Sequence, residues 1–176
     1  MTYEGLVACI CEGGAERTII KILLDNDLLK FSNEQLLDGE ILGKRDRSAK
    51  NFEKNHLKKS FDEKITVVRI LDSFGEKFEL SKLYKDKVGV INVITAPEIE
   101  IFVIINENKY KEYQKVKSSM KPSEFCKKEL NISNVKSPQF IETYFSDKEV
   151  LVNTLKKYKS MRTMRPGEQC IADLLK

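Results

Sequence analysis

A short apolar run that stops at a pair of glycines is the feature that most restricts the fold of this chain. Leu6 to Ile10 is apolar and contains Val, Ile and Cys, and Cys-Glu-Gly-Gly follows at residues 11–14. A run of this length that ends in a glycine turn is typical of a buried strand. Ala15 to Leu29 then carries apolar residues at helical spacing. The chain is therefore predicted to begin with a strand, a tight turn and a helix.

Two further strands are predicted at Ile65 to Leu71, which ends at Asp72, and at Val88 to Thr95. Strands that alternate with helices indicate an α/β fold with a mainly parallel sheet that is covered on both faces. A short helix at 33–37 and a strand at 40–42 are weaker predictions. After Thr95 the apolar residues alternate as in a strand, but Pro97 favours a helix start, and we predict a helix there. The other predicted helices are 48–61, 76–84, 109–117, 123–130, 138–144, 148–161 and a short one after Pro166-Gly167.

The length of 176 residues fits one domain. We divide it into an α/β core at 1–120 and a helical C-terminal extension at 121–176 that packs on the same domain. The longest apolar runs are far shorter than a membrane span needs, and the N-terminus does not resemble a signal peptide. We therefore expect a cytoplasmic protein without membrane contact, whose four cysteines are reduced. Cys9 and Cys11 share one face of the first strand and are expected to be buried.

Carboxylates follow two of the predicted strands. Glu12 and Asp72 come directly after apolar runs. Glu16 follows Glu12 by four residues, and Glu76 follows Asp72 by four residues. In parallel sheets, ligands bind at the carboxyl ends of the strands. Carboxylate oxygens are the ligands that Mg²⁺ prefers, so these acids are candidates for a metal site. The alternative is local: acids stabilise a helix N-terminus, and Asp72 is a good turn residue.

Basic residues form a second group. Lys44, Arg45 and Arg47 lie in a segment predicted to be a mobile loop, and Arg162 and Arg165 follow the last long helix. Such residues neutralise phosphates in nucleic-acid complexes. The alternative is that they are solvated surface charges, since the net charge is only +4.

Other chemistries have little support in the sequence. Gly13-Gly14 is not followed by Gly-Lys-Ser/Thr, and the chain has no Gly-x-Gly-x-x-Gly, which argues against nucleotide hydrolysis and dinucleotide binding. A Ser-His-Asp triad would need His56, the only histidine. Its polar and charged neighbours indicate a solvated helix face instead. With one histidine and no Cys-x-x-Cys, the sequence does not indicate a structural zinc site.

Three segments together resemble the Toprim domain, over roughly residues 5–115. Residues 7–16, with Cys-Glu-Gly and a second acid four residues after Glu12, resemble the first Toprim motif in its RloB-like or OLD-type branch, whose small members accompany defence loci. Residues 96–105 resemble that branch's Pro-x-x-Glu motif, with Glu100 as its acid. The strand 67–71 with Asp72 stands where Toprim proteins carry Asp-x-Asp, but Phe74 replaces the second aspartate.

The resemblance implies a Toprim-like fold and a site for Mg²⁺ or Mn²⁺. Glu12 would act as general acid/base in strand breakage, and Asp72 would be the first metal ligand. Glu76 and Glu100 are the candidates to complete the metal site. The first hypothesis is therefore a metal-dependent nuclease or nicking enzyme for DNA or RNA, in phage defence. The second is an inactive Toprim-like module that docks a partner protein or nucleic acid, which Phe74 favours.

Overall fold

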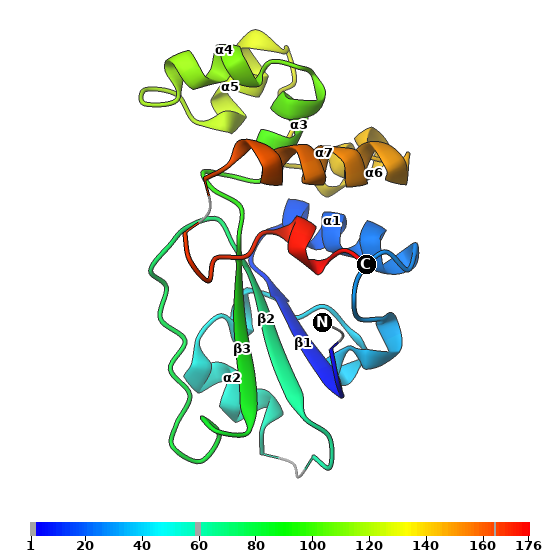
Figure 1. The fold of residues 1–176 in the computed structure, drawn as a ribbon, viewed down its shortest axis with the longest axis vertical. Coiled ribbons are helices and arrows are strands. Elements are labelled where there is room, and N and C mark those ends of the chain that lie inside the picture. The colour runs from blue at the N-terminus through cyan, green and yellow to red at the C-terminus, as the bar shows by residue number, and fades with distance from the viewer. Residues whose placement is uncertain (1–2, 59–60, 164) are drawn as a thin grey trace.

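A computed structural model describes residues 3–58, 61–163 and 165–176. Its centre is a parallel sheet of three strands in the order β1-β2-β3 (Figure 1). The strands are β1 Leu6–Cys11, β2 Ile65–Leu71 and β3 Val88–Ile94. The helices in the described residues are α1 Gly14–Asp25, α2 Ala49–His56, α3 Ile101–Asn106, α4 Tyr110–Val116, α5 Pro122–Glu129, α6 Pro138–Tyr144 and α7 Lys148–Met161. The predicted α/β class, with a parallel sheet flanked by helices, is confirmed.

The register aligns the carboxyl ends of the three strands at one end of the sheet. Cys11 pairs with Ile70, and Leu71 pairs with Ile94. Each outer edge is covered by a distant segment. Parallel bridges join β1 to Leu36 and Leu42, and the C-terminal segment bridges β3 through Gln169. The residues that follow the strands therefore start from neighbouring positions.

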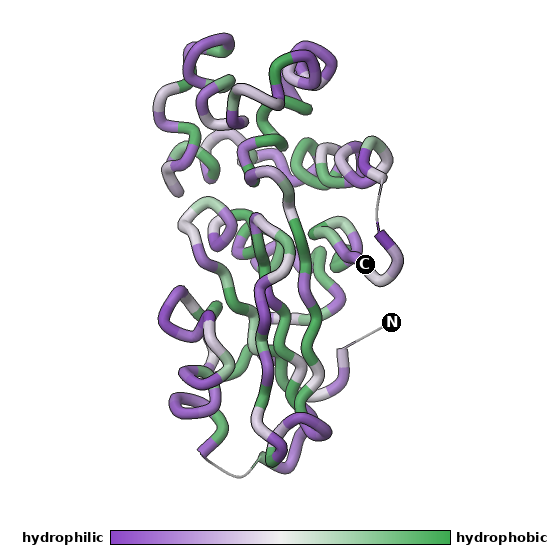
Figure 2. Tube along the Cα trace, turned by 90° about the vertical axis from the view of Figure 1, so that its left-hand side faces the viewer, coloured by the Kyte–Doolittle hydropathy of each residue, from purple (hydrophilic) through white to green (hydrophobic). Residues whose placement is uncertain are grey.

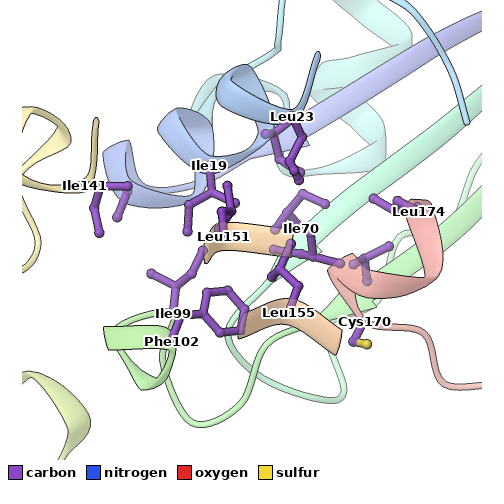
Figure 3. Close-up of a cluster of buried hydrophobic side chains, with 14 of the residues drawn as sticks. Ile19, Leu23, Ile70, Ile99, Phe102, Ile141, Leu151, Leu155, Cys170 and Leu174 are labelled. Carbon is purple, nitrogen blue, oxygen red and sulfur yellow. The ribbon is translucent and has the colours of Figure 1, made fainter. Parts of the chain in front are cut away.

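The main core lies on the sheet face that α1 covers. Val7, Cys9, Val68 and Ile70 point to this face, because side chains alternate along a strand. Helices α1, α3 and α7 and the C-terminal segment pack here (Figure 3), and α6 packs on α1. Five consecutive residues of α3, Ile101 to Ile105, are buried. A helix that is apolar all round belongs in a core, so the segment after Pro97 folds as a helix despite its alternating pattern.

The opposite sheet face carries a smaller core. Ala8, Ile10 and Val67 point toward it, and Phe52 and Leu57 from the α2 region cover them. The strands accordingly run as apolar segments through the middle of the molecule, while polar segments lie toward the outside (Figure 2). Strands β1 and β2 are therefore covered on both faces, as predicted, whereas β3 leaves Val90 and Asn92 exposed on the face of this smaller core.

Several predicted elements differ from the structure. The predicted helix 76–84 is wrong: residues 76–81 form no regular element and short turns follow. Side-chain contacts explain this, because Glu76 binds the buried Arg69 and the Phe78 ring lies against the same guanidinium. The predicted strand at 40–42 is only an isolated bridge at Leu42.

Some element boundaries also differ. The first helix ends at Asp25 rather than Leu29, and α2 ends at His56, while residues 59–60 of its predicted span lie outside the described part. Helix α3 begins at Ile101, four residues after Pro97. The predicted mobile loop at 44–47 contains a 3-10 turn, Lys44–Asp46.

The prediction of a solvated His56 is also wrong. Its side chain is buried between two carboxylates: Nδ1 lies 2.7 Å from Asp38 and Nε2 lies 3.1 Å from Asp46. The four cysteines are free, as predicted, and all four are buried, whereas burial was predicted only for Cys9 and Cys11. Within the described residues, no helix is both long and apolar enough to cross a membrane.

Removing buried volume at Ile19 tests the main core. Ile19 is fully buried on α1 where α1 faces the rest of the core (Figure 3). We expect Ile19→Ala to lower the free energy of unfolding by about 2–5 kcal/mol, through lost burial and a residual cavity. Lys21→Ala, on the exposed side of the same helix, is the control and should change it by less than about 0.5 kcal/mol. Equal effects in urea unfolding would contradict the packing of this face.

Candidate functional site

Four carboxylates line one small pocket at the carboxyl end of the sheet. The pocket has a volume of about 220 Å³. Asp72 comes from the end of β2, Glu16 from the first turn of α1, and Glu98 and Glu100 from the segment between β3 and α3. The remaining lining residues are Gly13, Gly14, Ala15 and Lys136. The structure therefore brings Asp72 and Glu100 together, as the resemblance implied.

The two glycines after β1 have separate roles in shaping this pocket. A Cβ atom on Gly13 would collide with the carboxylate of Glu16. A Cβ atom on Gly14 would lie 2.8 Å from Cγ of Pro138, closer than such atoms normally approach. Gly13 therefore leaves space for an acid over the turn, and Gly14 allows α6 to approach α1.

Burial and mutual repulsion disturb the acids in this pocket. Burial raises the pKa of Glu16, and the nearby Asp72 and Glu12 raise it further. Burial also raises the pKa of Glu100 to about 7, with contributions from Glu98 and Glu16. Among the described residues, the structure shows no ion pair or side-chain hydrogen bond for the carboxylates of Glu16, Asp72 and Glu100. Glu100 is buried, Glu16 is half-buried and Asp72 is exposed. Burying an acid that has no ion pair is costly, and perturbed groups such as Glu16 and Glu100 are typical of functional sites.

Lys136 is the cation of this pocket. Its Nζ lies 3.3 Å from Oε1 of Glu98, while Oε2 of Glu98 accepts a 2.9 Å hydrogen bond from the Ser123 hydroxyl. Burial opposes the charge of Lys136, but Glu100 and Glu98 raise the pKa of this lysine. Glu98 is thus the acid that Lys136 pairs with directly, while the charge of Lys136 also acts on Glu16 and Glu100 without an ion pair.

Glu12 and Glu76 belong to a neighbouring charge network instead. Nε of Arg47 lies 2.7 Å from Oε1 of Glu12, and its guanidinium also binds Glu76. Glu76 in turn lies 3.0 Å from the buried Arg69, which donates to the Asn92 side chain at 3.1 Å. The structure therefore does not bring Glu76 into the pocket. Glu12 borders the pocket closely enough to affect Glu16, but its partner is Arg47.

The predicted nucleic-acid-binding residues lie in different settings. Arg47 is engaged by the two glutamates, whereas Lys44 and Arg45 are exposed on the 3-10 turn beside it. Arg162 and Arg165 lie next to Phe74, near the end of β2. The structure thus places Arg47 at the acids and holds Arg162 by Glu168 and the carbonyl of Ile94, whereas Lys44, Arg45 and Arg165 are exposed.

The donor set of the pocket fits a hard divalent cation such as Mg²⁺, which takes carboxylate oxygens and retains several waters. The side chains are not arranged for metal binding in this conformation. Within residues 3–58, 61–163 and 165–176, no three His, Cys, Asp or Glu side chains form a group that could hold an ion as they stand. An ion would therefore require side-chain rotation, which the exposed Asp72 allows.

Sequence reasoning missed two pocket residues. Glu98 lies inside the Pro-x-x-Glu segment, two residues before Glu100, so the motif itself could have drawn attention to it. Lys136 lies 38 residues beyond Glu98 and carries no local signal. Only the packing of α5 and α6 around the pocket brings it there.

Comparison with known proteins gives no match: no family model, no curated protein and no solved structure is similar to this chain.

The pKa of Glu100 predicts a pH-dependent stability. Its pKa rises from an ordinary 4.5 to about 7 in the folded state, so the folded protein holds this proton more tightly than the unfolded chain. Stability is therefore lost as pH rises through this window. We expect Glu100→Gln to become more stable than the wild type by roughly 1–3 kcal/mol between about pH 4.5 and about pH 8 without metal. Urea unfolding measures this difference, and Glu79→Gln, an exposed acid, is the control. A constant difference across this range would contradict the burial of Glu100.

Proposed function

We propose that this protein is a metal-dependent nuclease or nicking enzyme that cleaves nucleic-acid phosphodiesters. The observation that carries the proposal is the gathering of Glu16, Asp72 and Glu100 in one pocket at the carboxyl ends of the strands, where none of the three forms an ion pair with another described residue. A divalent cation relieves the repulsion among these acids. The order of motifs that resembles the Toprim domain supports the same chemistry.

Asp72, Glu16 and Glu100 would hold Mg²⁺ or Mn²⁺, and the waters of the ion would fill the rest of its shell. When bound, the ion supplies charge stabilisation to a phosphate and to its leaving oxygen. Phe74 provides no oxygen ligand, so the role of the missing aspartate passes to the two glutamates. Glu76 remains with Arg47 and Arg69.

The chain's other residues would bind and orient the substrate. Arg47 holds Glu12 at the edge of the pocket, where Glu12 would act as general acid/base toward the reacting oxygen. Lys136 keeps Glu98 neutralised and presents a positive charge to an incoming phosphate. The exposed Lys44 and Arg45 would contact the phosphate backbone.

Calorimetric titration with Mg²⁺ and Mn²⁺ tests the metal site directly. We expect the wild type to bind at micromolar to millimolar metal. Asp72→Asn and Glu16→Gln should each weaken binding by at least about tenfold, because losing even a group that supports a ligand has such an effect. Glu79→Gln removes an exposed acid elsewhere and is the matched control. No heat of binding at millimolar metal would overturn the metal site.

A plasmid-nicking assay tests cleavage of DNA, and incubation with a labelled RNA in parallel tests cleavage of RNA. Cleavage should require the metal and be lost in Asp72→Asn and Glu12→Gln. Metal binding without cleavage of DNA or RNA would reject the nuclease and leave the second candidate, a binding or regulatory module. That candidate is favoured by Phe74 and by the ion pair between Glu12 and Arg47, since both reduce the number of acids open to an ion.

A further inference from the structure

Phe74 is an exposed aromatic ring shortly after the end of β2, the strand that leads into the carboxylate pocket. It follows Asp72 by two residues, and 40% of its surface is accessible to solvent. The other exposed large apolar residues in the described part are Leu83, Val90 and Met161, so Phe74 is the only aromatic one among them. A ring in this position is open to a ligand that also reaches the pocket.

Two arginines from the C-terminal region meet this ring. The guanidinium carbon of Arg165 lies 4.5 Å from the ring centroid of Phe74, and that of Arg162 lies 5.3 Å from it. They differ in how they are held. Arg162 donates to the carbonyl of Ile94 at 2.7 Å and pairs with Glu168. The guanidinium of Arg165 has no carboxylate partner among the described residues, and it is exposed.

An exposed aromatic ring flanked by guanidinium groups has the chemistry of a base-stacking surface. Every nucleobase presents a π-face to an aromatic side chain, and arginine adds a cation–π contribution and a charge for phosphate. Bases within a duplex are stacked on one another and cannot reach such a ring. Unpaired bases can, so the surface favours single strands.

We propose that Phe74, Arg162 and Arg165 form a stacking platform that binds an unpaired base of single-stranded nucleic acid. Phe74 contacts the base, Arg162 supports the ring from a fixed position, and Arg165 pairs with a phosphate of the strand. The consequence for cleavage rests on the proposed function. If the protein is a nuclease, a base held on this platform places the adjoining phosphodiester beside Asp72. The phenylalanine at the second Asp-x-Asp position then selects the substrate rather than binding metal.

Fluorescence anisotropy in EDTA tests the platform separately from the metal site. The probes are labelled oligo(dT) and oligo(U), an abasic strand of equal length, and a duplex. The wild type should bind at least one base-containing single strand more tightly than the abasic strand and the duplex. Phe74→Leu keeps apolar bulk without a ring and should weaken binding of that single strand by roughly 5-fold to 150-fold, the range for one stacked base. Phe74→Tyr should retain affinity, and Leu83→Ala is the exposed apolar control.

Arg165→Gln provides an independent test. It should weaken binding and lower the salt dependence of log K by about one phosphate contact. The melting temperature of Phe74→Leu, measured by thermal unfolding, should be close to that of the wild type, because the ring is exposed.

Three results would overturn the platform. They are equal affinity of Phe74→Leu and the wild type for the single strand, equal affinity of the wild type for base-containing and abasic strands, and no binding of either oligonucleotide. These results are independent of metal. Loss of metal binding alone would leave the platform standing, and loss of the platform alone would leave the metal site standing.

Discussion

Parallel pairing of three strands, with β1 and β2 buried on both faces, is the constraint on which the rest of this structure depends. Such a sheet must be covered by its own connections, and α1 on one face and α2 on the other do this. Parallel pairing also directs all three strands to one end, so Glu12, Asp72 and the segment after β3 emerge together. The concentration of acids at that end follows from the topology.

Such a concentration of negative charge requires compensation, and the chain provides it unevenly. Arg47 and Arg69 neutralise Glu12 and Glu76 on one side, and Lys136 neutralises Glu98 on the other. Glu16, Asp72 and Glu100 have no ion pair among the described residues, and burial and neighbouring acids raise the pKa values of the two glutamates although Lys136 lowers them. The free-energy cost of keeping incompletely compensated acids close together is the physical reason to expect a cation.

Local patterns were enough to predict most of the fold. The spans of β2, α6 and α7 agree with their predicted limits, because apolar periodicity and flanking Pro or Asp residues define them. The errors occur where side chains far apart in sequence override local preference. Glu76 is held by Arg69 on the sheet, so the predicted helix 76–84 does not form, and His56 is buried by the carboxylates of Asp38 and Asp46.

The candidate site divides in the same way. Asp72 and Glu100 were predictable because each belongs to a motif at a strand end or helix start, whereas Lys136 and the arginines at Phe74 depend on how the C-terminal half folds back. Arg162 reaches Phe74 because its guanidinium is tied to the carbonyl of Ile94 at the edge strand. The resemblance alone marks Phe74 only as a position without a metal ligand, whereas the structure shows an exposed ring in contact with two arginines. The contacts with Arg162 and Arg165 are therefore the basis of the role proposed for this ring.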